Sequence, residues 1–485
     1  MSKPKNRTGS GWALLLLSIA TEFGCAPTNN VIGVKRTVAA NNGSGGTTTG
    51  GGTAGEGTTT GGGTAGEGTT TGGGTAGGGT TTGGGTGDSH GGTAGSVPSG
   101  LSGASGAGGS PLATGGTVSS GGSFAGSGGL AVPGAIAFSD PVEYDTGDSP
   151  RSLALADLNA DGRLDLIVSN WIGGSVSVLL GKGDGRFEAK VDYAAAATAN
   201  WVTLGDLNSD GMLDVALTTF GSDTVKVLLG AGDGSFGPMT SYPATQGMFS
   251  AALGDVNNDG KLDLATSLSP GASASASVFL GDGAGQFAAP RYFTNASASF
   301  CVALQDLNGD GKLDLARANP DENSVSILFG TGDGSFVTGA DYATGQYPIF
   351  VSFGDLNSDG KLDMVTADAY SNEAGVHLAT GNGEFAPRVG YATENYPNHL
   401  SLADLNGDQH LDMIVVNRIT GWLTVRAGHG DGTFAERVEY ETGTRPSRLP
   451  EMAAVGDLNA DGVPDLAVVN SQSDSVSILL ATHTN

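Results

Sequence analysis

The sequence is poor in cysteine and in basic residues, and both shortages exclude classes of protein. Its two cysteines cannot build the disulfide framework of a small secreted domain. Lys and Arg number 22 against 49 Asp and Glu, which gives a net charge of −27. This acidity argues against nucleic acid or an anionic membrane surface as the main partner. Charged residues make up only 15% of the chain, so it is not a highly charged disordered protein either.

Long apolar runs and catalytic motifs are also missing. The apolar run near the N-terminus, Trp12–Ala20, is nine residues long, whereas a membrane-spanning helix requires about 20. The sequence contains no H-E-x-x-H zinc motif, no G-x-x-x-x-G-K-[ST] phosphate loop and no nucleophile elbow between a strand and a helix. The six histidines form no spaced set. A protein that is not an enzyme is therefore expected.

Residues 1–25 have the organisation of an export signal. A basic region comes first, the apolar run follows, and Gly24-Cys25 stands at the distance of a cleavage site. The segment resembles a bacterial lipoprotein signal, in which Cys25 becomes the lipidated N-terminus. Phe23 and Glu22 depart from the small or aliphatic residues of that motif. Two outcomes are therefore expected. The protein is either a lipoprotein of the bacterial cell envelope or outer surface, attached to a membrane only through a lipid at Cys25, or it is cleaved by an ordinary signal peptidase and secreted in soluble form.

Residues 26–133 form a low-complexity Gly/Thr-rich tract. An 11-residue unit, TTTGGGTAGEG, begins at Thr47 and again at Thr58. Glycine maximises backbone entropy, and no apolar residue in the tract is spaced to bury a face. We expect a disordered linker, with a root-mean-square span of roughly 50–60 Å for a Gly-rich coil of this length.

Residues 134–485 contain a repeat and nearly all of the acidity. They hold 17 basic and 45 acidic residues, a net charge of −28. The string D-x-N-x-D-G-x-x-D occurs seven times at intervals of 49 to 53 residues, with Gln409 in place of glycine in the sixth copy. A second string, G-x-G-x-F, follows each of the first six copies, and an aromatic residue lies six positions after its phenylalanine.

Each repeat is predicted to contain four short strands. An alternating run such as Trp201–Gly205 precedes the aspartate motif, and apolar runs such as Leu166–Val168 and Val176–Leu180 follow it. The glycine turn then leads into a fourth strand. No segment of the repeats has helical periodicity.

The two ends of this region predict a closed ring. The seventh repeat stops after its third strand, while residues 134–144 supply a strand of the missing kind, with Phe138 and Tyr144 six positions apart. An all-β, seven-bladed β-propeller of four-stranded antiparallel blades, closed by this N-terminal strand, explains both ends. An open solenoid would need capping repeats and would leave sheet edges exposed.

The aspartate motif has the chemistry of a Ca²⁺ loop. Positions 1, 3, 5 and 9 offer side-chain oxygens, position 7 offers its backbone carbonyl, and glycine at position 6 permits a sharp turn. A set of oxygen ligands favours calcium over zinc, copper or iron, and magnesium is less suited to a flexible loop. Up to seven structural ions are expected, the sixth loop binding most weakly. Solvated Asx turns without an ion are the alternative.

The candidate ligands, loop by loop, are Asp157, Asn159, Asp161, Arg163 and Asp165; Asp206, Asn208, Asp210, Met212 and Asp214; Asp255, Asn257, Asp259, Lys261 and Asp263; Asp306, Asn308, Asp310, Lys312 and Asp314; Asp355, Asn357, Asp359, Lys361 and Asp363; Asp404, Asn406, Asp408, His410 and Asp412; Asp457, Asn459, Asp461, Val463 and Asp465.

These repeats resemble the FG-GAP/VCBS repeats of the integrin α-subunit N-terminal propeller family. The resemblance covers residues 134–485 and rests on seven copies of the motif in phase. It implies a seven-bladed propeller with calcium in the loop between the first and second strands of a blade. It does not imply the ligands of integrins, because a fold does not specify a function.

The loops expected on the face opposite the metal loops vary more between repeats. They carry aromatic residues such as Trp171, Phe220 and Tyr370, with polar neighbours, which suits recognition of a protein or carbohydrate ligand. The alternative is that Trp171, Trp201 and Trp422 pack between blades. We expect a monomeric adhesion or recognition module. A polysaccharide lyase or hydrolase built on the same ring, and a scaffold for a catalytic partner, are the alternatives.

Overall fold

The computed structural model describes residues 31–32 and 136–482, except 196–197, 245–246, 270–271, 273, 295–297 and 446–447. The predicted export signal and Cys25 lie outside the described residues, as does the predicted linker apart from β1 (Val31–Ile32), which pairs in parallel with β3. The export signal, the lipid at Cys25 and the disordered linker therefore stay predictions. Within the described part of the chain, no helix is long and apolar enough to cross a membrane.

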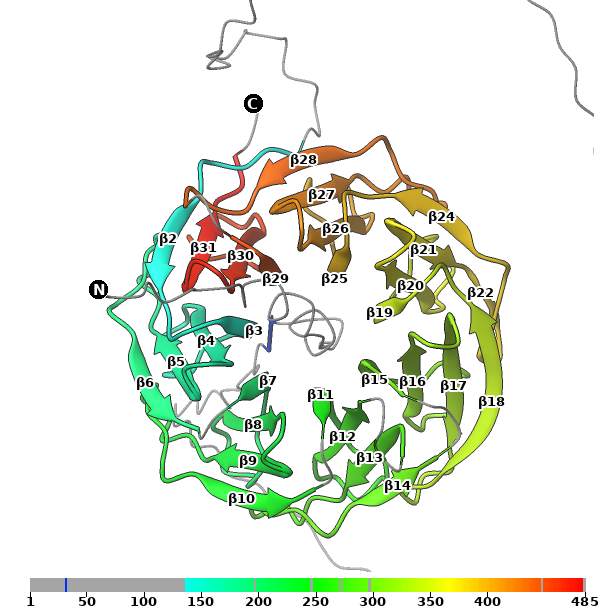
Figure 1. Ribbon diagram of the computed structural model, residues 1–485, viewed down its shortest axis with the longest axis horizontal. Coiled ribbons are helices and arrows are strands. Elements are labelled where there is room, and N and C mark those ends of the chain that lie inside the picture. Colours follow the sequence, from blue (N-terminus) through cyan, green and yellow to red (C-terminus); the bar gives the residue numbers. More distant parts are fainter. Residues whose placement is uncertain are drawn as a thin grey trace, which may run out of the picture. The chain divides into compact units, whose positions relative to one another are not determined.

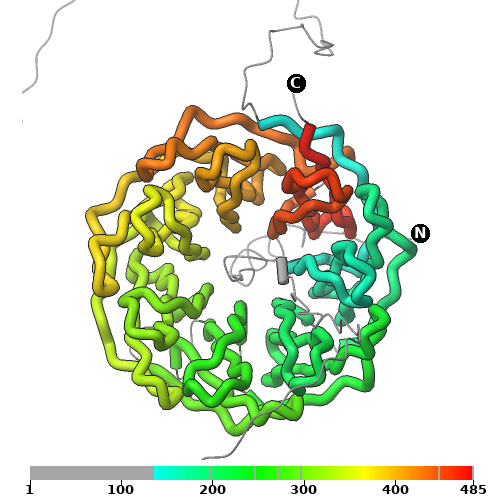
Figure 2. The backbone as a smooth tube through the Cα atoms, turned by 180° about the vertical axis from the view of Figure 1, so that it is seen from behind, coloured from blue at the N-terminus to red at the C-terminus, as the bar shows by residue number. Residues whose placement is uncertain are grey.

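The strands form seven four-stranded antiparallel sheets arranged around a central axis (Figures 1 and 2). This confirms the predicted all-β, seven-bladed propeller. In the first blade, β3 (Pro150–Ala156) is innermost, followed outward by β4 (Asp165–Asn170), β5 (Ser175–Leu179) and β6 (Val191–Ala194).

The next blades repeat this order from the inside outward. They are β7 (Ala199–Gly205), β8 (Asp214–Thr219), β9 (Thr224–Leu228) and β10 (Thr240–Pro243); β11 (Met248–Gly254), β12 (Asp263–Leu268), β13 (Ala276–Phe279) and β14 (Arg291–Phe293); β15 (Cys301–Gln305), β16 (Asp314–Asn319), β17 (Ser324–Gly330) and β18 (Phe336–Ala343); β19 (Pro348–Gly354), β20 (Asp363–Asp368), β21 (Glu373–His377) and β24 (Val389–Ala392); β25 (Pro397–Ala403), β26 (Asp412–Asn417), β27 (Trp422–Arg426) and β28 (Val438–Glu441). A short hairpin, β22 (Ala379–Gly381) and β23 (Glu384–Phe385), extends the fifth blade.

The last blade is closed by the first strand of the repeat region. It contains β29 (Pro450–Gly456), β30 (Asp465–Asn470) and β31 (Ser475–Leu479), and its outer strand is β2 (Val142–Asp145). Strand β2 runs antiparallel to β31 in the register Val142↔Ile478 to Asp145↔Ser475. The predicted closure by an N-terminal strand is therefore confirmed.

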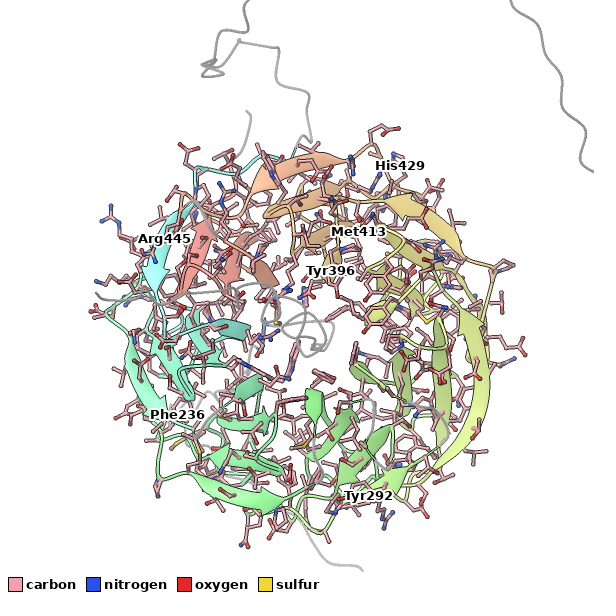
Figure 3. The ribbon with its side chains drawn as sticks, viewed as in Figure 1. Phe236, Tyr292, Tyr396, Met413, His429 and Arg445 are labelled. Atoms are coloured by element: carbon pink, nitrogen blue, oxygen red, sulfur yellow. The ribbon has the colours of Figure 1, made fainter. Side chains whose placement is uncertain are left out.

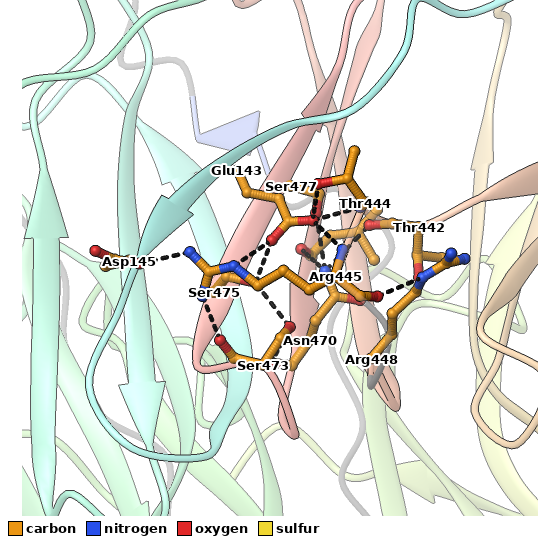
Figure 4. Close-up of polar contacts among 11 residues, drawn as sticks. Glu143, Asp145, Thr442, Thr444, Arg445, Arg448, Asn470, Ser473, Ser475 and Ser477 are labelled. Carbon is orange, nitrogen blue, oxygen red and sulfur yellow. Dashed lines mark hydrogen bonds and ion pairs between the residues drawn. The ribbon is translucent and has the colours of Figure 1, made fainter.

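Polar contacts reinforce this closure (Figure 4). The Arg445 guanidinium lies 2.8 Å from a Glu143 carboxylate oxygen and 2.7 Å from an Asp145 oxygen. The other Glu143 oxygen accepts hydrogen bonds from the backbone amides of Thr444 and Arg445. Burial opposes ionisation of Glu143, but the backbone hydrogen bonds outweigh it, so the pKa of this carboxyl is lowered. The carboxylate thus joins the first strand to the loop before the last blade.

The spacing between phenylalanine and the next aromatic residue has a structural role that the sequence did not reveal. The aromatic residue of each outer strand packs edge-to-face against the phenylalanine of the following blade, with ring centroids 5.1–5.6 Å apart. The pairs are Tyr144–Phe187, Tyr193–Phe236, Tyr242–Phe287, Phe293–Phe336, Tyr342–Phe385, Tyr391–Phe434 and Tyr440–Phe138. The last pair spans the closure, so blade packing is continuous around the ring.

Candidate functional site

The seven aspartate loops lie on one face of the propeller. Each joins the first strand of a blade to the second, as the loop between β3 and β4 does. The glycine turns lie beside them, because the Gly185 amide donates to the Leu458 carbonyl of the preceding loop at 2.9 Å, and Gly285 donates likewise to Leu207. Since strands alternate in direction, the connections from second to third strand and from blade to blade lie on the opposite face.

The side-chain oxygens of each loop accept hydrogen bonds from its own backbone. In the first loop, the two Asp157 oxygens accept from the amides of Asp161 and Gly162 at 3.0 and 2.9 Å. The Asn159 oxygen accepts from Asp161 at 3.0 Å, and an Asp161 oxygen accepts from Arg163 at 2.9 Å. This pattern recurs in the other six loops. Positions 1, 3 and 5 therefore share one compact turn.

The aspartate at position 9 is a buried clamp, a role that the sequence did not reveal. Asp165 is fully buried, and its two oxygens accept from the amides of Leu158 at 2.9 Å and Gly181 at 2.7 Å. It therefore ties the loop to the end of the third strand. Burial is the main cause that raises the pKa of Asp165 to about 6, and the negative charges of Asp161 and Asp157 add to it. Asp412 and Asp465 have the same environment and pKa values of about 6.

Two positions of the loop adopt left-handed backbone. Gly162 at position 6 has φ +84°, and a Cβ there would meet no atom within 4 Å. Gln409, at the same position of the sixth loop, has φ +70°. Because the equivalent Gly162 has open space around it, we expect the cost of glutamine there to be backbone strain and not a steric clash. Position 4 is also left-handed, as at Ala160 with φ +58°, which the sequence did not predict.

Side chains at position 7 turn back toward position 5 in four loops. The Lys361 ammonium lies 2.7 Å from an Asp359 oxygen, and Lys312 lies 3.2 Å from Asp310. Arg163 and Lys261 make longer contacts, of 3.5 and 3.7 Å, with the position 5 aspartate of their own loops. These exposed cations reduce the negative charge of the loop edge, and their hydrogen bonds with position 5 are weak in solvent.

The residue types of the loops fit a hard cation, and the side-chain geometry fits it less well. Each loop offers three carboxylates, one amide oxygen and one backbone carbonyl, all of them ligands that Ca²⁺ prefers. Among the residues that the structure describes, however, no three His, Cys, Asp or Glu side chains are grouped so as to hold a metal ion. The position 9 carboxylate directs its oxygens at backbone amides. Calcium in these loops stays a prediction.

A chain of aromatic rings follows the opposite face from the first blade to the sixth. We call it the aromatic arc; its members are Trp171, Phe220, Phe249, Phe300, Tyr347, Tyr370 and Tyr396. Successive ring centroids are 4.2–5.9 Å apart, and the closest pair, Tyr347 and Tyr370, is stacked with an interplanar angle of 10°. Tyr370 is 54% exposed, whereas Tyr396 is buried beside β25 (Figure 3).

An ion cluster near the axis lies beside both ends of the arc. Glu451 in β29 accepts two hydrogen bonds from Arg418 Nε, at 2.9 and 3.0 Å, and its side chain is almost fully buried. Arg151 in β3 lies 3.6 Å from the Glu451 Oε2 atom, which also accepts from Arg418, and 4.7 Å from the Trp171 ring centroid. The Arg418 amide donates to the Tyr396 carbonyl at 3.0 Å. We call Arg151, Arg418 and Glu451 the axial ion cluster.

The tryptophans differ in their roles. Trp201 is 2% exposed in β7 and belongs to the core, as expected if it packs between blades. Trp171 is half-buried and packs on Phe220 of the next blade, and it belongs to the aromatic arc. Trp422 begins β27 and lines a shallow surface pocket with Arg448.

Comparison with solved structures shows that the fold recurs at low sequence identity. A structure of BBS1N in complex with ARL6DN, soaked with mercury, matches with a TM-score of 0.52 and 10% identity over 72% of this chain and 98% of that one. An Agrocybe aegerita lectin that recognises non-reducing terminal N-acetylglucosamine matches with a TM-score of 0.45 and 18% identity, over 67% and 86%. A virginiamycin B lyase from Staphylococcus aureus matches with 0.47 and 13%, over 71% and 99%. A comparison with curated proteins finds no match.

The repeats themselves match a family model described as an FG-GAP-like repeat. The matched residues are 157–217, 206–266, 306–366, 355–415 and 404–468, which together span more than half of the chain. Each match begins at the first aspartate of a loop and runs into the following blade. On this evidence the chain belongs to the family of FG-GAP-like repeat proteins.

Proposed function

We propose that the protein is a non-enzymatic recognition module whose ligand binds the face opposite the aspartate loops. The observation that carries this proposal is the difference between the two faces. One face repeats the same loop seven times, whereas the other bears the aromatic arc and the axial ion cluster, each formed by different residue types from different blades. A binding surface requires such local variety, because seven equal positions offer no single orientation to a ligand.

A saccharide is the ligand that this face suits best. Tyr370 is exposed and stacked on Tyr347, so it presents a rigid aromatic face with a hydroxyl at its edge. Ile172 and Ile419 occupy the same position as Tyr370 after the second strand of their blades and are 71% and 60% exposed. Apolar faces next to charged groups match a sugar ring, which has both apolar and polar surfaces. A protein ligand is the other outcome to be tested.

We further propose that the aspartate loops bind Ca²⁺ as a structural ion. Three carboxylates in each of seven loops repel one another without a cation, and their donor oxygens match calcium in kind. The repetition of the loop in every blade favours a role in stability, since repeat proteins need the same support in each unit.

A glycan array combined with a polysaccharide depolymerisation assay tests the recognition proposal. We expect the full chain to retain particular glycans and to release no shorter products from them. Tyr370→Ala should weaken retention, and Tyr292→Ala, an exposed tyrosine of the outer strand β14, is the matched control. Turnover of a polysaccharide that is lost in the Tyr370 variant would refute a non-enzymatic module and support the alternative of an enzyme on the same ring.

A further inference from the structure

A surface pocket lies between the sixth and seventh blades, on the face opposite the aspartate loops. Its lining includes Ile419, Trp422, Glu441, Arg448 and Gln472, which come from β27, β28 and three connections of these two blades. Its volume is about 290 Å³, close to the lower end of the roughly 300–1,000 Å³ of pockets that hold small molecules. The pocket therefore has room for one ring of a larger ligand.

The connection that forms one wall of the pocket is longer than most others in the ring. Eight residues separate β28 from β29, whereas four separate the corresponding strands in five of the other six blade-to-blade connections. Arg448 belongs to this longer connection. Loops on a rigid scaffold tolerate insertions and often carry binding residues. The added length therefore favours a binding role at this interface between blades.

The tryptophan of the pocket is specific to the sixth blade. Trp422 is the first residue of the third strand, is half-buried and pairs across the sheet with Glu441 of β28. The third strands of the other blades begin with smaller or acidic residues, which are Ser175, Thr224, Ala276, Ser324, Glu373 and Ser475. Six blades thus form without an aromatic residue at this position. The fold does not require Trp422, which favours contact with a ligand.

Hydrogen bonds hold the Arg448 guanidinium in place at the pocket wall. Its Nη2 donates to a Glu441 carboxylate oxygen at 2.7 Å. Its Nε donates to the Arg445 carbonyl at 3.1 Å, and its Nη1 donates to the Gly421 carbonyl at 3.4 Å. The Arg448 side chain is only 19% exposed. A guanidinium has five N–H donors and a carboxylate has about four acceptor sites, so both groups can also bind a ligand.

The chemistry of the pocket matches a neutral sugar ring. A sugar has an apolar face, which suits Trp422, and adjacent hydroxyls, which can accept from Arg448 and donate to Glu441. The charges of the Glu441–Arg448 pair cancel, while residues 134–485 have a net charge of −28. This negative field disfavours a sugar that carries a carboxylate.

We propose that this pocket binds one neutral sugar residue of a saccharide, with its apolar face against Trp422 and its hydroxyls bonded to Arg448 and Glu441. Ile419 at the pocket is 60% exposed and occupies the position that Tyr370 has in the neighbouring fifth blade. The rest of the saccharide therefore extends over Ile419 toward Tyr370. This inference rests on the proposed recognition of a saccharide and specifies the class of sugar and its site.

The test is titration calorimetry of the full chain with the methyl glycosides of glucose, galactose, mannose and N-acetylglucosamine. We expect at least one of them to bind. Trp422→Ser, which introduces the residue found at this position in three other blades, should weaken that binding about tenfold or more, as truncation of a binding anchor does. Tyr292→Ala, which removes an exposed aromatic side chain of β14, is the control and should leave binding unchanged.

A second comparison tests the preference for a neutral sugar. The methyl glycosides of glucuronate and galacturonate should bind about fivefold more weakly than those of glucose and galactose, the effect of one like charge about 4 Å away in water. Glu441→Gln keeps a hydrogen-bonding side chain and should remove most of this difference. Melting temperatures of the variants check that each is folded.

The outcomes separate this inference from the proposed function. If no methyl glycoside binds, or if Trp422→Ser binds as well as the wild type, the pocket is not a sugar site. Retention of glycans on an array that depends on Tyr370 would then leave saccharide recognition intact. Equal or tighter binding of the uronates would overturn the preference for a neutral sugar. Binding of a protein ligand and of no glycan would overturn both proposals.

Discussion

The buried aspartate at position 9 makes the stability of the calcium-free protein depend on pH in an unusual direction. The pKa values of Asp165, Asp412 and Asp465 are raised to about 6 in the folded state, against about 4 in an unfolded chain. Between these values the folded state binds more protons than the unfolded state. The contribution of these three carboxyl groups to folding stability is therefore fully present below pH 4 and is lost as the pH rises through 6.

The size of this stability loss follows from the shift in the aspartate pKa values and from how far the carboxyl groups are buried. A shift of about two units corresponds to roughly 3 kcal/mol, and solvent around the neighbouring loop reduces this to on the order of 1–3 kcal/mol for each aspartate. A bound cation would favour the ionised carboxylate and remove this loss. In the presence of a chelator, the melting temperature should fall as the pH is raised from 4.5 to 7.5. In the presence of calcium, it should fall less over the same pH range.

One substitution isolates the effect. Asp165→Asn cannot titrate, so its unfolding free energy in chelator should depend less steeply on pH than that of the wild type, although the variant is less stable at pH 4.5. Asp184→Asn is the control, because Asp184 lies in the exposed glycine turn of the same blade. Equal pH slopes for the wild type and Asp165→Asn would show that Asp165 does not titrate with a raised pKa, and so would a melting temperature that rises with pH in chelator.

Other predictions concern the loops and the closure. Gln409→Gly should raise the free energy of unfolding by about 0.5–1 kcal/mol, because glycine adopts the left-handed backbone there without strain. Gly162→Ala should lower the free energy of unfolding for the opposite reason. Denaturant melts that show the opposite signs would contradict the loop geometry. Removal of residues 136–145 should expose the edge of β31 and cause a lower melting temperature and association in light scattering; an unchanged monomeric melt would argue against closure by β2. Tyr440→Ala should cost about 2–4 kcal/mol by removing the Phe138 contact, and a loss below 0.5 kcal/mol would show that this aromatic pair is dispensable.

The fold was predictable because the repeats fix both its period and its ends. Seven motifs in phase set the number of blades, and the mismatch between the last repeat and residues 134–144 indicated how the ring closes. The inner strands could be predicted from their residue pattern alone. Small residues alternate with large ones along runs such as β3, which is buried throughout. Within the aspartate loops, the positive φ at position 4 was not predicted. Alanine or serine occupies this position in four copies and rarely adopts that conformation, whereas Asn258, Gly309 and Gly407 favour it in the others.

The candidate sites were less predictable, because their residues meet only in the closed ring. Arg151 and Glu451 are 300 positions apart and become neighbours when the seventh blade reaches the first. The aromatic arc likewise combines residues from six blades, and the sequence pointed to several of them without indicating that they touch. The role of Asp165 was hidden for another reason: an aspartate that accepts backbone amides and one that binds a metal have the same sequence pattern.

We propose above that the aspartate loops form a calcium-supported scaffold for a binding face on the other side. The most direct test is a calcium titration of the full chain after chelator treatment, followed by calorimetry at pH 7. We expect several calcium ions per chain, up to seven, with about 2.7 kcal/mol of added stability for each site at a free calcium concentration 100 times its dissociation constant. Absence of calcium binding heat, together with an unchanged melting temperature, would contradict it.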